Sequence, residues 1–139
     1  AGVYVRQLVQ EHLHLSERVL ELRHAAVLKP HVDVVAAHLL PYWEDEPIGV
    51  DRREADGQLS IEKHLVDIYK KVQARFPGKK IVIGETGWPS DGRMRSDARP
   101  GRVEQVKYFS IFRGAAEREG FDYNVIEAFD QDRPRLSIR

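Results

Sequence analysis

Glu85 has the surroundings that best suit chemistry in this 139-residue sequence. It follows the apolar run Ile81-Val-Ile-Gly84 and precedes Thr86-Gly-Trp-Pro-Ser90. A carboxylate at the tip of a buried strand, beside a glycine, is poorly placed for a structural role. The glycine permits close approach of another group, and Trp88 offers a flat face of the kind on which sugar rings stack. The alternative is a glutamate that pairs with an arginine in a core, and the residues favour the functional interpretation.

Other candidate site residues fall at or near the ends of predicted strands. Tyr42 and Trp43 follow an apolar run directly, and two adjacent aromatic residues at such a rim favour a ligand contact over core packing. His38 lies inside the same run and is equally well interpreted as a hydrogen-bonded core histidine or as a site residue. Glu127 lies within the last apolar run, where a structural ion pair with a neighbouring strand is one interpretation.

The elements that position these residues form a repeating pattern. Apolar runs at 32–40, 80–84 and 123–129 are typical of strands covered on both faces. Helical apolar periodicity separates them, at 61–76 and again at 106–116. Strand, helix, strand, helix, strand with short helix-to-strand turns predicts right-handed crossovers and a parallel sheet. The long polar loops all follow strands, which is where parallel α/β architectures build their active sites.

The helices have predictable ends and faces. Ser60 is expected to be the N-cap of the helix predicted at 61–76. Pro77-Gly78 is expected to end this helix. In the second, the predicted buried face is formed by Val106, Phe109, Phe112 and Ala116. Residues 1–30 contain apolar residues at helical spacing as well, so we expect one or two helices there.

Composition narrows the classes of partner. Twenty-two basic residues balance twenty-two acidic ones, which argues against nucleic acid or an anionic membrane as the main partner. The chain has no cysteine, so neither a disulfide framework nor thiolate chemistry is available. Its sequence contains no apolar run of about 20 residues that would span a membrane, and no signal peptide is recognisable. Metal-ligand spacing is absent too, so no metal is expected.

The run Ile81-Val-Ile-Gly-Glu-Thr-Gly-Trp-Pro-Ser-Asp-Gly92 resembles the signature of glycoside hydrolase family 17. This family comprises β-1,3-glucanases and related glucanosyltransferases. The resemblance implies a retaining mechanism on a (β/α)8 barrel, with Glu85 as nucleophile and without a cofactor. It also implies that Glu127 is a pocket residue, an interpretation as good as the structural ion pair. Segments 34–43 and 122–131 resemble the sixth and eighth barrel strands, and both are most similar to bacterial members. The resemblance covers roughly residues 31–131, and implies a β-glucan substrate and a secreted, periplasmic or cell-envelope location.

Departures from the family's pattern qualify this expectation. In the family, the acid/base glutamate follows an asparagine, whereas the one asparagine here, Asn124, is followed by Val125. A retaining glycosidase needs both carboxyl groups, and a complete barrel takes about 250 residues. We therefore expect residues 1–139 to form a single incomplete domain: the C-terminal portion of a TIM barrel, with about three parallel strands, preceded by a helical segment. Its hydrolase or transglycosylase activity would be impaired or lost. The alternative is a non-catalytic glucan-binding module or a remnant half-barrel that self-associates.

Two structural expectations follow from this interpretation. The site residues should open onto one cleft at the carboxyl edge of the sheet, namely Glu85, Tyr42, Trp88 and Glu127. The incomplete barrel should also leave apolar strand residues uncovered and prone to self-association. These residues are Val34, Ala36, Ile81, Ile83 and Val125.

Overall fold

The computed structural model describes residues 33–126. Five elements alternate along this part of the chain: β1 (Val34–Leu39), α2 (Ser60–Arg75), β2 (Lys80–Thr86), α3 (Arg102–Glu119) and β3 (Asp122–Val125). The helices expected within residues 1–30, and the end of the third apolar run with Glu127, lie outside the described residues.

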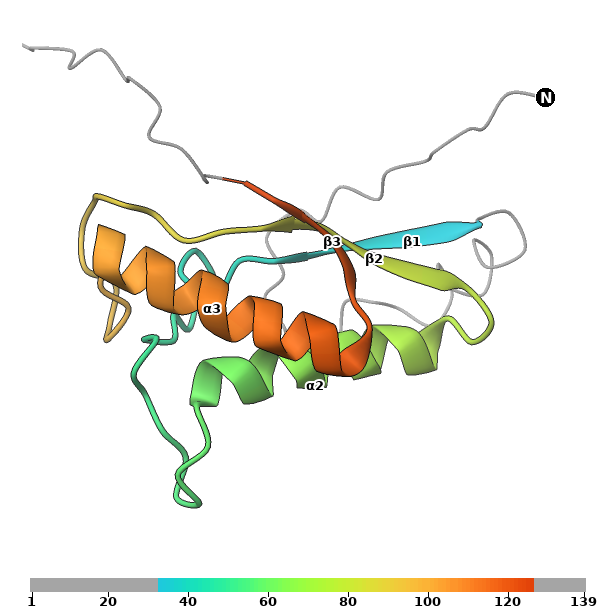
Figure 1. Cartoon of the computed structure of the whole chain (residues 1–139), viewed down its shortest axis with the longest axis horizontal. Coiled ribbons are helices and arrows are strands. Elements are labelled where there is room, and N and C mark those ends of the chain that lie inside the picture. The colour runs from blue at the N-terminus through green and yellow to red at the C-terminus, as the bar shows by residue number, and fades with distance from the viewer. Residues whose placement is uncertain (1–32, 127–139) are drawn as a thin grey trace, which may run out of the picture.

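The three strands form one parallel sheet in the order β1-β2-β3, and α2 and α3 lie side by side against one of its faces (Figure 1). Strand order thus follows chain order without a switch point. This is how strands and helices succeed one another in a (β/α) barrel, in contrast to a doubly wound sheet with helices on both faces. The expected α/β architecture with parallel strands is confirmed.

The two faces of the sheet differ in their environment. Facing the helices are five buried apolar side chains: Val35, Ala37, Leu39, Ile81 and Ile83. The opposite face, which we call the open face, includes Val34, 44% exposed, and the half-buried Ala36 and Val82. The expectation that Ile81 and Ile83 would be uncovered is therefore wrong, because these residues alternate toward the helices. The expectation holds for Val34, while Ala36 and Val125 are half-buried.

Helix α2 packs on the sheet through Ile61, Leu65 and Tyr69, which are buried. Its N-cap is Leu59, and no side-chain hydrogen bond caps this end. The predicted cap, Ser60, is instead the first helical residue. Its hydroxyl is buried and finds no hydrogen-bond partner in the described part of the chain, so the cap prediction is wrong.

Helix α3 presents a face that is rotated from the predicted one. Its buried residues are Tyr108, Phe112, Ala115 and Ala116, whereas Val106 is 69% exposed. The helix ends at Gly120, which adopts the left-handed conformation that favours glycine (φ 73°) and donates its N–H to the carbonyl of Ala116.

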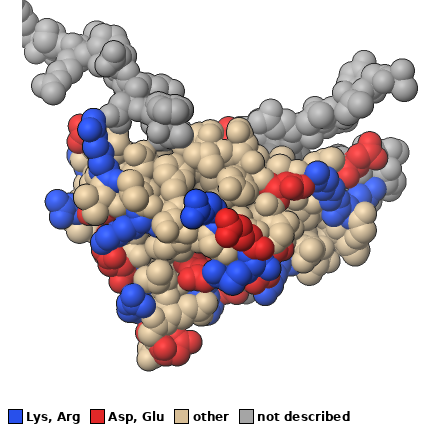
Figure 2. Space-filling model, viewed as in Figure 1, with Lys and Arg blue, Asp and Glu red and all other residues tan. Residues whose placement is uncertain are grey.

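Ion pairs join the outer surfaces of the helices. Arg118 of α3 contacts Glu62 of α2, and Lys70 Nζ of α2 lies 3.2 Å from Glu119 Oε2 of α3. Figure 2 shows basic and acidic side chains interspersed over the face that the helices present. Such partly exposed pairs contribute little stability individually, so buried packing holds the layers together.

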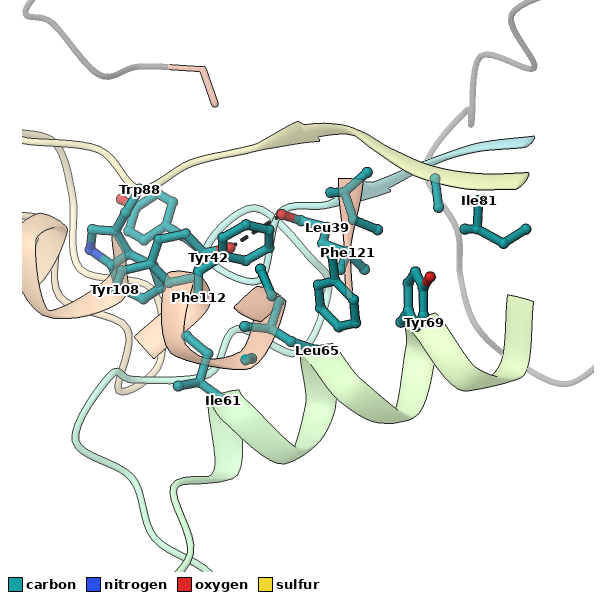
Figure 3. Close-up of a cluster of buried hydrophobic side chains, with 14 of the residues drawn as sticks. Leu39, Tyr42, Ile61, Leu65, Tyr69, Ile81, Trp88, Tyr108, Phe112 and Phe121 are labelled. Atoms are coloured by element: carbon teal, nitrogen blue, oxygen red, sulfur yellow. Dashed lines mark hydrogen bonds between the residues drawn. The ribbon is translucent and has the colours of Figure 1, made fainter. Parts of the chain in front are cut away.

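Tyr108 joins α3 to β1 and β2 from within the aromatic core (Figure 3). Its wholly buried hydroxyl lies 2.5 Å from Thr86 Oγ1 and also donates to the carbonyl of Leu39 at 3.4 Å. Burial raises the pKa of Tyr108 above its ordinary value, so the phenol stays protonated and remains a donor. The residue therefore fixes the carboxyl ends of β1 and β2 relative to each other.

Replacing Tyr108 by phenylalanine is expected to lower the free energy of unfolding by about 1–2 kcal/mol, because the buried Thr86 hydroxyl loses its partner. Urea unfolding measures the change. Tyr123→Phe is the matched control, since that side chain is 42% exposed, and it should leave the midpoint nearly unchanged. Equal midpoints for the two variants would contradict the anchoring role of Tyr108.

Candidate functional site

A β-bulge in β2 decides where the Glu85 carboxylate points. Ala37 pairs with Ile83, but the next β1 residue, His38, pairs with Glu85, so two residues of β2 oppose one of β1. The register of β2 with β3 shifts over the same stretch. Strict alternation would send Glu85 toward the helices with Ile83. The extra residue instead puts Glu85 on the open face and turns Thr86 into the core, where it is wholly buried.

His38 and Glu85 meet on the open face near the carboxyl end of the sheet. His38 Nδ1 lies 3.4 Å from Glu85 Oε2, and the two side chains are 14% and 38% exposed. Gly84 makes this approach possible, because a Cβ atom there would lie 3.2 Å from His38 Nε2 and 3.4 Å from the Cβ of Ala36. The sequence-based expectation that this glycine admits a neighbouring group agrees with the geometry.

The aromatic candidates form a separate cluster inside the core. Trp88 is wholly buried, with ring centroids 5.4 Å from Tyr42 and 5.3 Å from Tyr108, and its Nε1 donates to the carbonyl of Arg99. Tyr42 is also buried, at 5% exposure, and lies beside Trp88 in Figure 3. Trp43 is half-buried, with its ring centroid 5.1 Å from that of Tyr42. Trp88 thus presents no ring face to a sugar. Of the aromatic residues predicted to contact substrate, Trp43 is the most accessible.

The expected single cleft is therefore divided within the described residues. His38 and Glu85 lie together on the open face, while Tyr42 and Trp88, from the loops that follow β1 and β2, pack against each other in the core. Glu127, the fourth expected member, lies outside the described residues. The sheet register explains the division, because the bulge turns Glu85 to one face and the chain then enters the core at Thr86.

Polar contacts join the loops that follow β1 and β2. Arg95 Nη1 donates to the carbonyl of Tyr42 at 2.8 Å, and its guanidinium carbon lies 5.9 Å from the centre of the Tyr42 ring. Asp97 accepts the backbone N–H of Gly49 at 3.0 Å through Oδ1 and pairs with Arg52 through Oδ2. Sequence reasoning missed this role of Arg95 and Asp97. These contacts hold the rim above the aromatic cluster in a defined shape.

The chemistry available at the open face is that of a half-exposed carboxylate held beside an imidazole. Such a carboxylate can act as a nucleophile or as a general base. Within residues 33–126, no cluster of three or more His, Asp or Glu side chains is arranged to hold a metal ion. Neither described helix is long and apolar enough to cross a membrane.

Comparisons with known proteins agree on one class of enzyme. The family model of the BtgE/BtgC glycoside hydrolase domain matches residues 7–134. A probable β-glucosidase btgE from Aspergillus clavatus is 31% identical over 75 residues, which cover 54% of this chain and 12% of that protein.

Two solved structures of a Rhizomucor miehei β-1,3-glucanosyltransferase share the fold. One is an active-site mutant in complex with laminaritriose, with a TM-score of 0.63 and 24% identity. The other is described as a member of glycoside hydrolase family 17, with a TM-score of 0.60 and 25% identity. Each match covers 76% of this chain and 36% of the solved chain. The chain thus spans about a third of these structures and an eighth of the Aspergillus protein.

Proposed function

Because the chain belongs to the BtgE/BtgC glycoside hydrolase domain family, we propose that it carries the nucleophile half of a retaining site for β-1,3-glucan. The observation that carries the proposal is the bulge that brings Glu85 to the open face at the carboxyl end of β2. Active sites of (β/α) barrels lie at this end of the strands. The laminaritriose bound by the Rhizomucor glucanosyltransferase supports a β-1,3-glucan as the substrate class.

The proposed reaction has two displacements. A Glu85 carboxylate oxygen attacks the anomeric carbon while the glycosidic bond to the leaving sugar breaks, and the leaving oxygen takes a proton from a general acid. The product is a glycosyl ester of Glu85. In the second step, the acid, now acting as base, removes a proton from an incoming hydroxyl that displaces Glu85. Water as acceptor gives hydrolysis, and a glucan hydroxyl gives transglycosylation.

The general acid is the missing half of this mechanism. The family's donor follows an asparagine, and the one asparagine of this sequence, Asn124, precedes Val125. We propose that the proton donor of the full site lies on a part of the barrel that this sequence does not include. The open face, with Val34 exposed and Glu85 38% exposed, is the surface that would turn toward the barrel interior.

Covalent labelling tests Glu85 as nucleophile without requiring the general acid. The probe is an activated aryl β-glucoside with fluorine replacing the hydroxyl beside the anomeric carbon, so that the leaving group needs little protonation and the ester persists. Intact mass spectrometry should show one added glycosyl group, and peptide mapping should place it on Glu85. Glu85→Gln should abolish the adduct, because the neutral amide is a poor nucleophile.

Glu46→Gln is the matched control, because Glu46 is an exposed carboxylate in the loop that follows β1. Its labelling should equal that of the unchanged protein. An adduct that forms on another carboxylate, or that persists in Glu85→Gln, would remove Glu85 from the proposed role.

A further inference from the structure

We propose that His38 is a positioning residue for Glu85, holding one carboxylate oxygen so that the other can attack the sugar. The proposal rests on the proposed role of Glu85 as nucleophile. The observation behind it is the 3.4 Å separation between His38 Nδ1 and Glu85 Oε2. It gives a specific form to the site-residue interpretation that the sequence left open for His38.

The imidazole is fixed in place by its surroundings. The ring edge that carries Nε2 lies over Gly84, since a Cβ atom there would come within 3.2 Å of Nε2 and 3.3 Å of Cδ2. With this edge over the glycine, the Nδ1 edge faces Glu85, the next residue of β2. The His38 side chain is only 14% exposed, so it has little freedom to take another orientation.

The bulge and the glycine act together. Without the extra residue in β2, Glu85 would not share a face with His38. A Cβ atom at position 84 would lie 3.2 Å from His38 Nε2, so that the imidazole would have to shift by a few tenths of an ångström. The bulge and the glycine of β2 thus both favour one contact, and such features are common next to active sites.

The contact has a defined chemical consequence. A protonated Nδ1 donates toward Oε2 and favours a single orientation of the carboxylate. The direction of Oε1 is then fixed as well, because the carboxylate group is planar. A nucleophile must be held in near-attack geometry, and a misplacement of about 1 Å can cost roughly 10²-fold in rate. His38 would act on the reaction through Glu85 and need not touch the sugar.

Side-chain replacements separate this role from simple packing. Asparagine can place its amide nitrogen near the position of Nδ1, whereas glutamine reaches toward the position of Nε2. The rate of adduct formation with the fluorinated aryl glucoside should fall by roughly 10²-fold in His38→Ala. It should be largely retained in His38→Asn and reduced in His38→Gln. Gly84→Ala keeps the imidazole but displaces it, so its rate should lie between those of the unchanged protein and His38→Ala.

Nitrogen-15 NMR of the 139-residue chain provides a readout that does not depend on activity. The Nδ1 signal of His38, assigned by its absence from His38→Asn, should have the shift of a protonated nitrogen. In Glu85→Ala, which removes the acceptor, this proton should move to Nε2. A histidine with a purely structural role would keep its proton where it was.

The outcomes separate this proposal from the one on which it rests. An unprotonated Nδ1, or a proton distribution unaffected by Glu85→Ala, overturns the positioning role even if Glu85 is labelled. Labelling rates equal to that of the unchanged protein in His38→Ala overturn it too, while Glu85 remains the nucleophile. Failure to label Glu85 in the unchanged protein refutes the nucleophile instead, and the NMR result then stands for the contact alone.

Discussion

No measurable hydrolysis of laminarin is expected from the 139-residue chain alone. The reason is chemical: protonation of the leaving oxygen by a positioned acid contributes typically about 10²–10⁴-fold, and the sequence lacks the Asn-Glu pair that supplies it in the family. Orientation of the sugar by surrounding walls contributes further large factors. The three described strands provide only part of those walls. Release of reducing sugar from laminarin, followed over hours, measures the activity.

Labelling by the aryl probe in the same preparation distinguishes a missing acid from a misfolded nucleophile site. Laminarin turnover that disappears in Glu85→Gln would contradict the expectation and show that a carboxylate of this chain donates the proton, with Glu127 the first candidate. Turnover that survives Glu85→Gln would exclude Glu85 from the mechanism. Glucan binding without turnover or labelling would favour the alternative, a non-catalytic glucan-binding module.

Trp88→Ala is expected to cost about 3–5 kcal/mol of the free energy of unfolding, the range for truncating a buried tryptophan. The indole is wholly buried against Tyr42 and Tyr108, and its N–H satisfies the carbonyl of Arg99. Since domains are stable by about 5–15 kcal/mol, this loss would remove a large part of the total. Thermal and urea unfolding monitored by circular dichroism measure the change.

Val106→Ala serves as the control because Val106 is 69% exposed on α3, and its effect should stay within about 0.5 kcal/mol. A tryptophan that served as a sugar-stacking platform would give the opposite result for Trp88→Ala. Its removal would leave unfolding unchanged and weaken only glucan binding. That pattern would return Trp88 to the surface role expected from the sequence.

The sequence determined the order of elements and predicted the end of the sheet at which the candidate site lies. The apolar run before Glu85 required a buried strand, and the glycine next to it indicated that another group approaches there. The described structure confirms the parallel α/β pattern and the bounds of β2 to within a few residues. Local composition was sufficient because continuous apolar runs and helical periodicity are properties of neighbouring residues.

Helix faces and caps were less predictable. Val106 fits the apolar spacing of α3 but is exposed, whereas Tyr108 is buried, where its hydroxyl donates to the carbonyl of Leu39 and bonds with the Thr86 hydroxyl. Ser60 has the side chain of an N-cap, yet the helix begins one residue earlier than capping by Ser60 would require. Tertiary contacts overrode local preference in both cases.

The tertiary structure alone decided which residues share the site. Whether Glu85 faces the core or the open face depends on a one-residue bulge, and the bulge is defined by the pairing of β2 with β1 and β3. The ring of Trp88 could stack on a sugar or pack in the core, and its contacts with Tyr42 and Tyr108 make it a core residue. Side-chain direction in a strand has a period of two, so a single register shift, which involves residues far apart in the chain, moves a carboxylate from one face to the other.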